Sequence, residues 1–236
     1  MQDQQNISYT GLNELLTLEY MQNYNQSIVI DANNCHINAE SIVDFGAGIG
    51  TLSKIFRNKF NKETICVEID ETNINYLKQR NFIYLNNIEN LKESVDLVFS
   101  SNVLEHIEDD YAILTLLRKK LKNNGRIFLY LPAKMILWSK LDEVVGHYRR
   151  YEISKLKKLV QKAGFKIIKI NYSDSLGFLL ALIWRVLNKF NKYSLPSKKS
   201  LIFYDRFIFP FSRIIDNIGF KYLIGKNIIL VAKKHI

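Results

Sequence analysis

The stretch SIVDFGAGIGTLS, residues 41–53, contains the residue types most suited to holding a small ligand. Asp44 is followed at alternate positions by Gly46, Gly48 and Gly50. Because glycine has no Cβ, such a loop lets a ligand come close to the backbone. A carboxylate accepts hydrogen bonds from hydroxyl and amino groups. The stretch therefore predicts a loop that binds a polar or cationic small molecule.

Two common phosphate-binding patterns do not fit this loop. A P-loop requires a lysine after its last glycine, and Thr51 follows Gly50 here. The dinucleotide pattern GxGxxG requires a third glycine at the position of Thr51. Glu68 ends the next apolar stretch, 18 residues after Gly50, and a carboxylate there can accept two hydrogen bonds from a ribose diol. This combination favours an adenosyl ligand without a pyrophosphate.

Short apolar stretches alternate with helical patterns along most of the chain. The predicted strands are 41–45, 64–69, 81–86, 95–101, 126–133, 165–172 and 227–234. The predicted helices are 11–29, 50–60, 71–80, 108–125 and 154–164. This alternation is typical of a parallel sheet with helices on both faces. We therefore expect an α/β fold around a mostly parallel, seven-stranded sheet.

The 236 residues fit one large domain with an elaborated lid. We expect four parts in this domain. They are an N-terminal helical segment (1–40), a ligand-binding core (41–172), a helical lid insertion (173–226) and a closing strand (227–236).

Three sequence features together resemble the class I methyltransferases that use S-adenosylmethionine. They are VDFGAGIG, Glu68 and SSNVLEHIED (100–109). The resemblance covers roughly residues 15–235 and implies a Rossmann-like sheet with an antiparallel closing strand. It implies that Asp44 and the glycine loop hold the methionine part and that Glu68 holds the ribose. Asn87 stands near where the family often has an Asp that contacts the adenine amino group. The expected cofactor-binding residues are Asp44, Gly46, Ala47, Gly48, Gly50, Glu68, Ile69, Asn87, Ser101 and Asn102.

Further motifs are similar to those of a methyltransferase subgroup associated with glycan and lipid-linked pathways. They are LEYMQNYN (18–25), LEHIEDD (104–110) and DEVVGHYRRYE (142–152). Within the last motif we expect His147, Tyr148 and Arg149 to be catalytic. A histidine has a suitable pKa for taking the acceptor proton, and Arg149 and Arg150 can clamp a phosphate or carboxylate. In the alternative, the arginines pair with nearby carboxylates and His147 only packs.

Two other positions near these motifs have both a functional and a structural interpretation. His106 in LEHIED is more consistent with shaping the loop under the cofactor than with catalysis. Tyr24 and Asn25 either close the N-terminal helix over the cofactor or pack that helix on the sheet edge.

Charge is divided unevenly along the chain, whose net charge is +10. The first 120 residues have 10 Lys and Arg against 17 Asp and Glu, and the remainder has 23 against 6. A basic half favours an anionic partner such as a phosphate, a nucleic acid or an acidic membrane, or forms a solvated surface. Aromatic and basic residues interleave over 175–215. This pattern favours peripheral membrane contact, a cap on an apolar substrate, or packing against the domain or a second subunit.

Several function classes are disfavoured by what the sequence lacks. No nucleic-acid-binding module accompanies the basic residues, and SSNV replaces the (N/D)PP(Y/F) tetrapeptide typical of amino-methylation of bases. The metal-ligand spacings of Cys and His are absent, so we expect no metal. The two cysteines fit a reducing compartment, MQDQQNISYT does not resemble a signal peptide, and the longest apolar run (176–184) is too short to span a bilayer. We expect a cytoplasmic location with possible contact at the inner membrane surface, and the sequence leaves the oligomeric state open.

These observations predict an S-adenosylmethionine-dependent methyltransferase. The expected acceptor is a hydroxyl on a small or lipid-linked anionic molecule, with saccharides among the candidates. The alternatives are methylation of RNA or protein, and a non-catalytic, cofactor-binding partner of another subunit.

Overall fold

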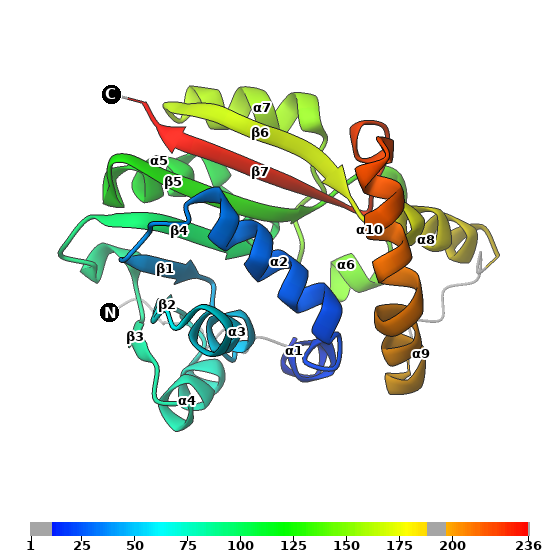
Figure 1. The fold of residues 1–236 in the computed structure, drawn as a ribbon, viewed down its shortest axis with the longest axis horizontal. Coiled ribbons are helices and arrows are strands. Elements are labelled where there is room, and N and C mark those ends of the chain that lie inside the picture. The colour runs from blue at the N-terminus through cyan, green and yellow to red at the C-terminus, as the bar shows by residue number, and fades with distance from the viewer. Residues whose placement is uncertain (1–10, 188–196, 236) are drawn as a thin grey trace, which may run out of the picture.

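The computed structural model describes residues 11–187 and 197–235 and contains one seven-stranded sheet (Figure 1). Its strands, in spatial order, are β3 (Ile83–Leu85), β2 (Ile65–Val67), β1 (Ile42–Phe45), β4 (Val95–Ser101), β5 (Leu121–Pro132), β7 (Asn227–Lys234) and β6 (Phe165–Ser173). Strands β1 to β5 are mutually parallel, and β7 is antiparallel to both of its neighbours. The predicted, mostly parallel sheet and its antiparallel closing strand are confirmed.

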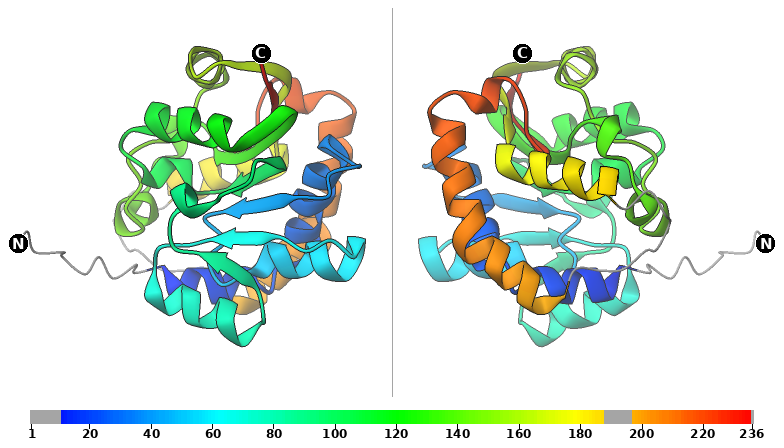
Figure 2. Two further views of the ribbon diagram at one scale, coloured as in Figure 1. Left: turned by 90° about the vertical axis from the view of Figure 1, so that its left-hand side faces the viewer. Right: turned by 90° about the vertical axis from the view of Figure 1, so that its right-hand side faces the viewer.

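Helices cover both faces of the sheet (Figure 2). The α-helices are α1 (Leu12–Leu18), α2 (Gln22–Cys35), α3 (Thr51–Phe60), α4 (Glu71–Gln79), α5 (Asp110–Lys120), α6 (Lys140–Val144), α7 (Ile153–Lys162), α8 (Ser175–Leu187), α9 (Lys198–Phe203) and α10 (Phe209–Asn217). Among the described residues, no helix is long and apolar enough to cross a membrane.

The apolar core is divided by the sheet into two main layers. On one face, α5 and α7 bury Leu117 and Val160 against the sheet. On the other face, α2, α3 and α10 bury Val29, Phe56 and Phe209. Strands covered on both faces are mostly apolar, which is why β1 and β4 were recognisable in the sequence.

Two predicted helices have different limits in the structure. The helix expected over 108–125 ends at Lys120, because Leu121 is fully buried and pairs with Val95 as the start of β5. Strand pairing thus takes precedence over the helical pattern in this segment. The helical segment expected over 11–29 is divided between α1 and α2 by a turn at Glu19–Met21.

The described part of the segment between β6 and β7 is largely helical. It contains α8, α9, the π-helical turn η4 (Tyr204–Ile208), α10 and the short 3-10 helix η5 (Phe220–Tyr222). Asp205 accepts hydrogen bonds from the backbone N–H groups of Asn23 and Tyr24, and Asp216 accepts those of Asp174 and Ser175. These two buried carboxylates attach the insertion to α2 and to the end of β6.

Candidate functional site

The glycine loop lies at the carboxyl end of β1, at the sheet edge where open α/β folds bind ligands. Gly46, Gly48 and Gly50 all have positive φ angles, of 76°, 54° and 79°. A Cβ at Gly46 would clash with the side chain of Val103 from the loop after β4. The alternating glycines therefore allow a tight turn, and they also allow the loop after β4 to approach the first loop.

Glu68 holds the glycine loop in place through its carboxylate. Its Oε2 accepts the N–H of Gly48 at 2.7 Å, and its Oε1 accepts those of Ile69 at 2.8 Å and Asp70 at 3.0 Å. A carboxylate offers about four acceptor positions, so about one remains for a ribose hydroxyl. Glu68 thus positions the loop as well as having the chemistry to contact a ribose, and only the second of these roles was expected.

Asp44 is a buried carboxyl group next to the glycine loop. Burial is the largest effect on it and raises its pKa to about 7, although a 2.7 Å hydrogen bond from Ser53 acts in the opposite direction. The negative charge of Glu68 contributes to the increase. A cation placed here would stabilise the ionised form of Asp44. This site therefore fits the ammonium of an amino-acid ligand.

Helix α1 lies across the glycine loop. The side chain of Leu15 approaches to 3.2 Å from the position that a Cβ on Gly48 would take. Glu19, just after α1, accepts hydrogen bonds from Thr51 at 3.0 Å and Arg80 at 2.7 Å. The covering residue Leu15 was not predicted, because no local pattern shows which part of the sheet a terminal helix will contact.

The remaining expected cofactor residues lie at the ends of neighbouring strands. Ile69 follows Glu68 and is 82% exposed, and the exposed Asn87 side chain accepts the N–H of Glu89 at 2.8 Å. Ser101 ends β4, and the Asn102 side chain donates to its hydroxyl at 3.2 Å. Ala47 donates its backbone N–H to Val67 at 3.0 Å. The parallel strands therefore bring these predicted residues to one edge of the sheet.

His147 is held between two carboxyl groups in the loop that follows β5. Its Nδ1 lies 2.8 Å from Asp142 Oδ1, and its Nε2 lies 3.9 Å from Glu105 Oε1. Burial favours raising the pKa of Asp142, but the hydrogen bond with His147 and the charge of Arg150 lower it to about 2. An ionised Asp142 fixes the orientation of the His147 ring and favours a proton on Nδ1. The Nε2 atom is then the one able to accept a proton.

Glu105 is the second carboxyl group beside His147 and is fully buried. Neither of its side-chain oxygens has a hydrogen-bond partner within the described residues. Burial raises the pKa of Glu105 to about 8, which keeps it largely protonated at neutral pH. It immediately precedes His106, whose ring lies edge-on to that of His147 with centroids 4.5 Å apart. Burial, followed by the nearby His147, lowers the pKa of His106 to about 4, so His106 is neutral.

The two arginines of GHYRRY are both paired. Arg150 donates to both oxygens of Asp142, as the structural alternative in the sequence analysis expected. Arg149 instead pairs with Asp110 at 2.7 Å, a partner that the sequence did not indicate. Tyr148 is 55% exposed, and its backbone N–H donates to the carbonyl oxygen of Glu105. The motif is therefore attached to the loop after β4 at several points.

The loop after β4 connects the glycine loop to His147. Val103 in this loop packs on Gly46, and Glu105, two residues later, faces His147. The loop after β4 therefore contacts both predicted motifs, which are about a hundred residues apart in the sequence. Sequence reasoning missed Glu105 and Asp142 as partners of His147. The acids at both positions were visible, but only the tertiary fold shows their pairing.

Tyr24 and Asn25 contribute to packing in this structure. Both are buried, and the Tyr24 ring stacks edge-on against Tyr130 and Phe209, with centroids 5.7 Å and 5.1 Å away. The Asn25 side chain donates to the carbonyl oxygen of Leu18 at 2.8 Å. These contacts support the structural interpretation of both residues.

One group of side chains in the described residues has donors that can hold a metal ion. It consists of Glu105, His106 and His147, with donor atoms within 4.8 Å of one another. Bonds of about 2.0–2.1 Å to a tetrahedral zinc ion would place ligand atoms about 3.3 Å apart. The 3.9 Å between His147 Nε2 and Glu105 Oε1 exceeds this value. The cluster would therefore have to contract around an ion.

Comparisons with known proteins show the family of the chain. The sequence profile of a family described as a methyltransferase domain matches residues 18–170, more than half of the chain. The chain therefore belongs to this methyltransferase domain family. No curated protein matches the sequence.

Solved methyltransferase structures share the fold. An S-adenosylmethionine-dependent methyltransferase from Archaeoglobus fulgidus is 21% identical, with a TM-score of 0.56 and coverage of 89% of this chain and 94% of that one. A putative methyltransferase in complex with the activator Trm112 from Haloferax volcanii is 13% identical, with a TM-score of 0.60. The match covers 97% of this chain and 99% of that one. Phosphoethanolamine N-methyltransferase 2 from Haemonchus contortus is 15% identical, with a TM-score of 0.61. The match covers 96% of this chain and 58% of that one.

Family and fold together define a class I methyltransferase whose cofactor is S-adenosylmethionine. The loops at the ends of β1, β2 and β4 offer the groups that this cofactor needs. Asp44 suits its ammonium, Glu68 its ribose, and the positive-φ glycines a close approach of its sulfur-bearing chain.

Proposed function

We propose that this protein transfers a methyl group to a hydroxyl oxygen of a small or lipid-linked anionic acceptor, with saccharides among the candidates. The observation that supports this acceptor chemistry most is His147 with its Nδ1 held by ionised Asp142. An oxygen nucleophile has a proton to lose, and a positioned imidazole is suited to take it. The motifs LEHIEDD and GHYRRY, both of which contribute to this site, also support the glycan- and lipid-linked subgroup.

In the proposed mechanism the cofactor supplies an electrophilic methyl group, and the chain supplies positioning and a base. Asp44 and Glu68 orient the cofactor at the ends of β1 and β2. Nε2 of His147 would accept the proton that the hydroxyl loses on methylation, and the cofactor would leave as S-adenosylhomocysteine once its methyl–sulfur bond has broken. Asp142 stabilises the resulting imidazolium, and neutral Glu105 lies beside it without adding a second negative charge.

The anionic character of the acceptor is supported by the basic second half of the chain. Tyr148 and Arg149 directly follow His147 and belong to the proposed catalytic group. To contact the acceptor, Arg149 would have to leave its ion pair with Asp110. The Arg149 side chain is 27% exposed and that of Asp110 is 15% exposed, so this ion pair is partly open to solvent.

The experiment is an acceptor screen with cofactor carrying a labelled methyl group. Pure protein is incubated with a lipid extract, with phosphorylated saccharides, with RNA and with protein, and label is measured in each pool. Label in the lipid or saccharide pool that disappears with His147→Ala supports the proposal. Label in RNA or protein alone would replace it with the second candidate, which the basic half of the chain favours.

A further inference from the structure

The helix formed by α9, η4 and α10 presents a row of exposed apolar side chains. This row consists of Phe203, Phe207, Phe211, Ile214 and Ile218. Their exposed fractions run from 57% to 74%, and their spacing of four, four, three and four residues places them on one helix face. The other face buries Asp205, Phe209 and Asp216 against the protein. The row is therefore the outer side of an amphipathic helix and not part of the core.

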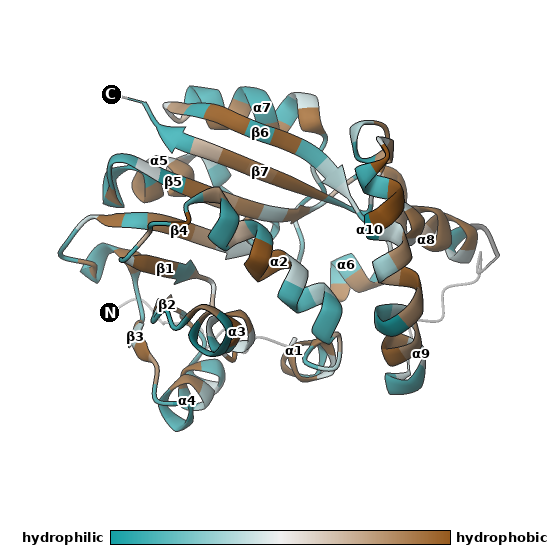
Figure 3. Cartoon of the chain, in the orientation of Figure 1, coloured by the Kyte–Doolittle hydropathy of each residue, from teal (hydrophilic) through white to brown (hydrophobic). Residues whose placement is uncertain are grey.

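Helix α8 adds a second exposed apolar group beside the first. Its members are Leu179, Leu180, Ile183 and Trp184, which are 41–65% exposed. The backbone N–H of Leu176 in α8 donates to the Ser212 hydroxyl in α10 at 3.0 Å, which joins the two helices. Both helices lie on the same side of the molecule (Figure 2), and their apolar character is visible in Figure 3.

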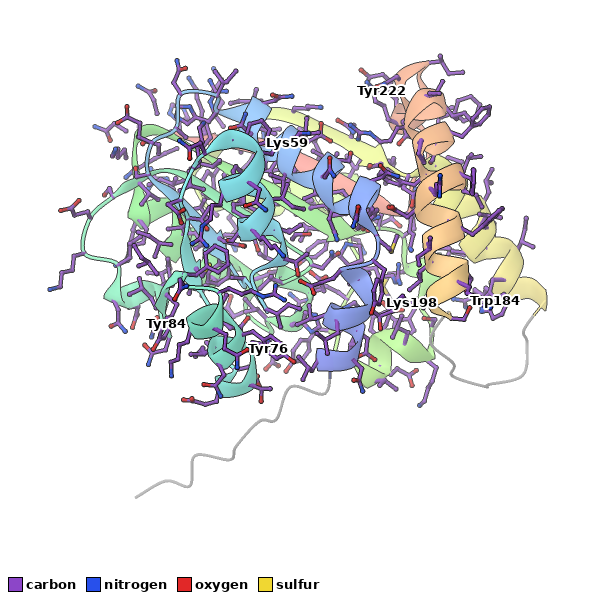
Figure 4. The ribbon with its side chains drawn as sticks, turned by 60° about the horizontal axis from the view of Figure 1, so that its bottom comes forward. Lys59, Tyr76, Tyr84, Trp184, Lys198 and Tyr222 are labelled. Atoms are coloured by element: carbon purple, nitrogen blue, oxygen red, sulfur yellow. The ribbon has the colours of Figure 1, made fainter. Side chains whose placement is uncertain are left out.

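The exposed charged side chains that belong to these helices are basic, and one of the basic side chains, Arg213, pairs with Asp31 of α2 at 3.0 Å. Residues 175–235 contain only two acidic residues, Asp205 and Asp216, and both are buried. Lys198, Lys199 and Arg206 are exposed on the same helices. In Figure 4, Lys198 and Trp184 lie towards one end of these helices and Tyr222 at their other end, on the side of the molecule away from Tyr84. This face therefore combines apolar and aromatic side chains with cations and has no exposed acid of its own.

We propose that this face, formed by α8, α9, η4 and α10, binds the surface of an anionic phospholipid bilayer. Hydrophobic stripes flanked by Lys and Arg are suited to lie in the plane of a bilayer, with apolar side chains among the acyl chains and cations at the phosphates. A second copy of the chain is a poorer partner, because a symmetric contact would bring two basic faces together. Nucleic acid is also poorer, since the aliphatic members of the face offer no stacking surface for bases.

Membrane binding would place the candidate active site near the lipid surface. The carboxyl ends of β1 and β4 point towards the side of the sheet where α8 and α10 lie (Figure 1). Arg185 of α8 donates to the carbonyl oxygen of Trp138, next to the exposed Met135 and Ile136 in the loop that leads to His147. The inference that a lipid-linked acceptor reaches the site from the bilayer rests on the proposed function, whereas the membrane contact itself does not.

The test is co-sedimentation of the full chain with vesicles. We expect binding to vesicles of phosphatidylcholine with phosphatidylglycerol, and little binding to phosphatidylcholine alone. Two exposed apolar side chains are removed in Phe207→Ser/Phe211→Ser, with Ile83→Ser/Ile168→Ser as the matched control on exposed positions of β3 and β6. We expect binding at least tenfold weaker for the first pair and unchanged for the control. Circular dichroism confirms that each variant is folded.

The charge contribution is tested separately with Lys199→Gln/Arg206→Gln. Each cation near an anionic surface contributes about a fivefold change in affinity, so we expect about 30-fold weaker binding for the pair. Lys119→Gln/Lys157→Gln removes two exposed cations elsewhere and is expected to change little. Equal effects of both pairs would mean that only net charge matters and would overturn the assignment to this face.

Other outcomes would overturn the proposal. They are failure to bind anionic vesicles, equal binding to both vesicle types, and a stable dimer in light scattering that Phe207→Ser/Phe211→Ser dissociates. Preferential binding of RNA by the same face would do so as well. None of these assays contains cofactor or acceptor. Calorimetry with S-adenosylhomocysteine on the same protein therefore shows separately whether the proposed function has failed.

Discussion

Replacing Glu68 with glutamine tests the cofactor site at its most connected residue. The Glu68 carboxylate accepts three backbone N–H groups, from Gly48, Ile69 and Asp70. If the amide oxygen keeps the last two hydrogen bonds, the amide NH₂ faces the N–H of Gly48, and two donors then meet. The glycine loop would lose its anchor, and a ribose hydroxyl would lose a charged acceptor. A hydrogen bond to a charged group contributes about 1.5–3 kcal/mol, equivalent to about 10- to 150-fold in affinity.

The assay separates these two consequences by comparing two ligands in calorimetry. One ligand is S-adenosylhomocysteine, and the other is its 2′,3′-dideoxy analogue, which has no diol. We expect Glu68→Gln to weaken the first ligand about 10- to 150-fold more than the second. Glu71→Gln, at an exposed acid in the next helix, is the control and is expected to change neither. Equal losses for the two ligands would refute a contact between Glu68 and the ribose and leave Glu68 only as the anchor of the loop.

Three further predictions concern the other groups of the site. The pKa of Asp44 is raised to about 7, so Asp44 becomes protonated and loses its attraction for the ligand ammonium as pH falls through 7. Calorimetry should therefore give about tenfold weaker binding of S-adenosylhomocysteine at pH 6 than at pH 8. Asp44→Asn should abolish this dependence, and a wild-type affinity that is flat with pH would contradict the assignment. His147→Ala should lower kcat about 10²- to 10⁴-fold with unchanged cofactor affinity. Arg149→Ala should instead raise KM for an anionic acceptor. If both variants keep full activity and lose only thermal stability, GHYRRY has a structural role and not a catalytic one. Activity should survive a chelator, because the proposed proton transfer to His147 uses no metal ion, and a loss that zinc restores would show a metal-dependent reaction.

The strands and most helices were predictable because the strands are covered on both faces. Burial on two sides makes β1 and β4 mostly apolar, and the more polar helices between them then stand out. The end of α5 was predicted wrongly for the same physical reason. Leu121 fits a helical pattern, but its pairing with Val95 and its burial decide for the strand. Local propensity cannot show which long-range pairing will compete with it.

The candidate site was predictable in its residue types but not in its partners. The glycines and the acids at the strand ends stand out in the sequence as residues suited to a ligand loop, and their binding of the cofactor stays a prediction. The pairing of His147 with Asp142 and Glu105, of Arg149 with Asp110, and of Leu15 with Gly48 depends on loop paths in three dimensions. The sequence offered several carboxylates for each cation and no physical ground for choosing among them.

The most direct measurement of the central claim is a crystal structure with S-adenosylhomocysteine bound. The account predicts that the ligand's ammonium lies at Asp44, its ribose hydroxyls at Glu68, and its sulfur towards the side where Nε2 of His147 lies. A ligand bound away from the glycine loop, or one whose sulfur points away from His147, would contradict the account.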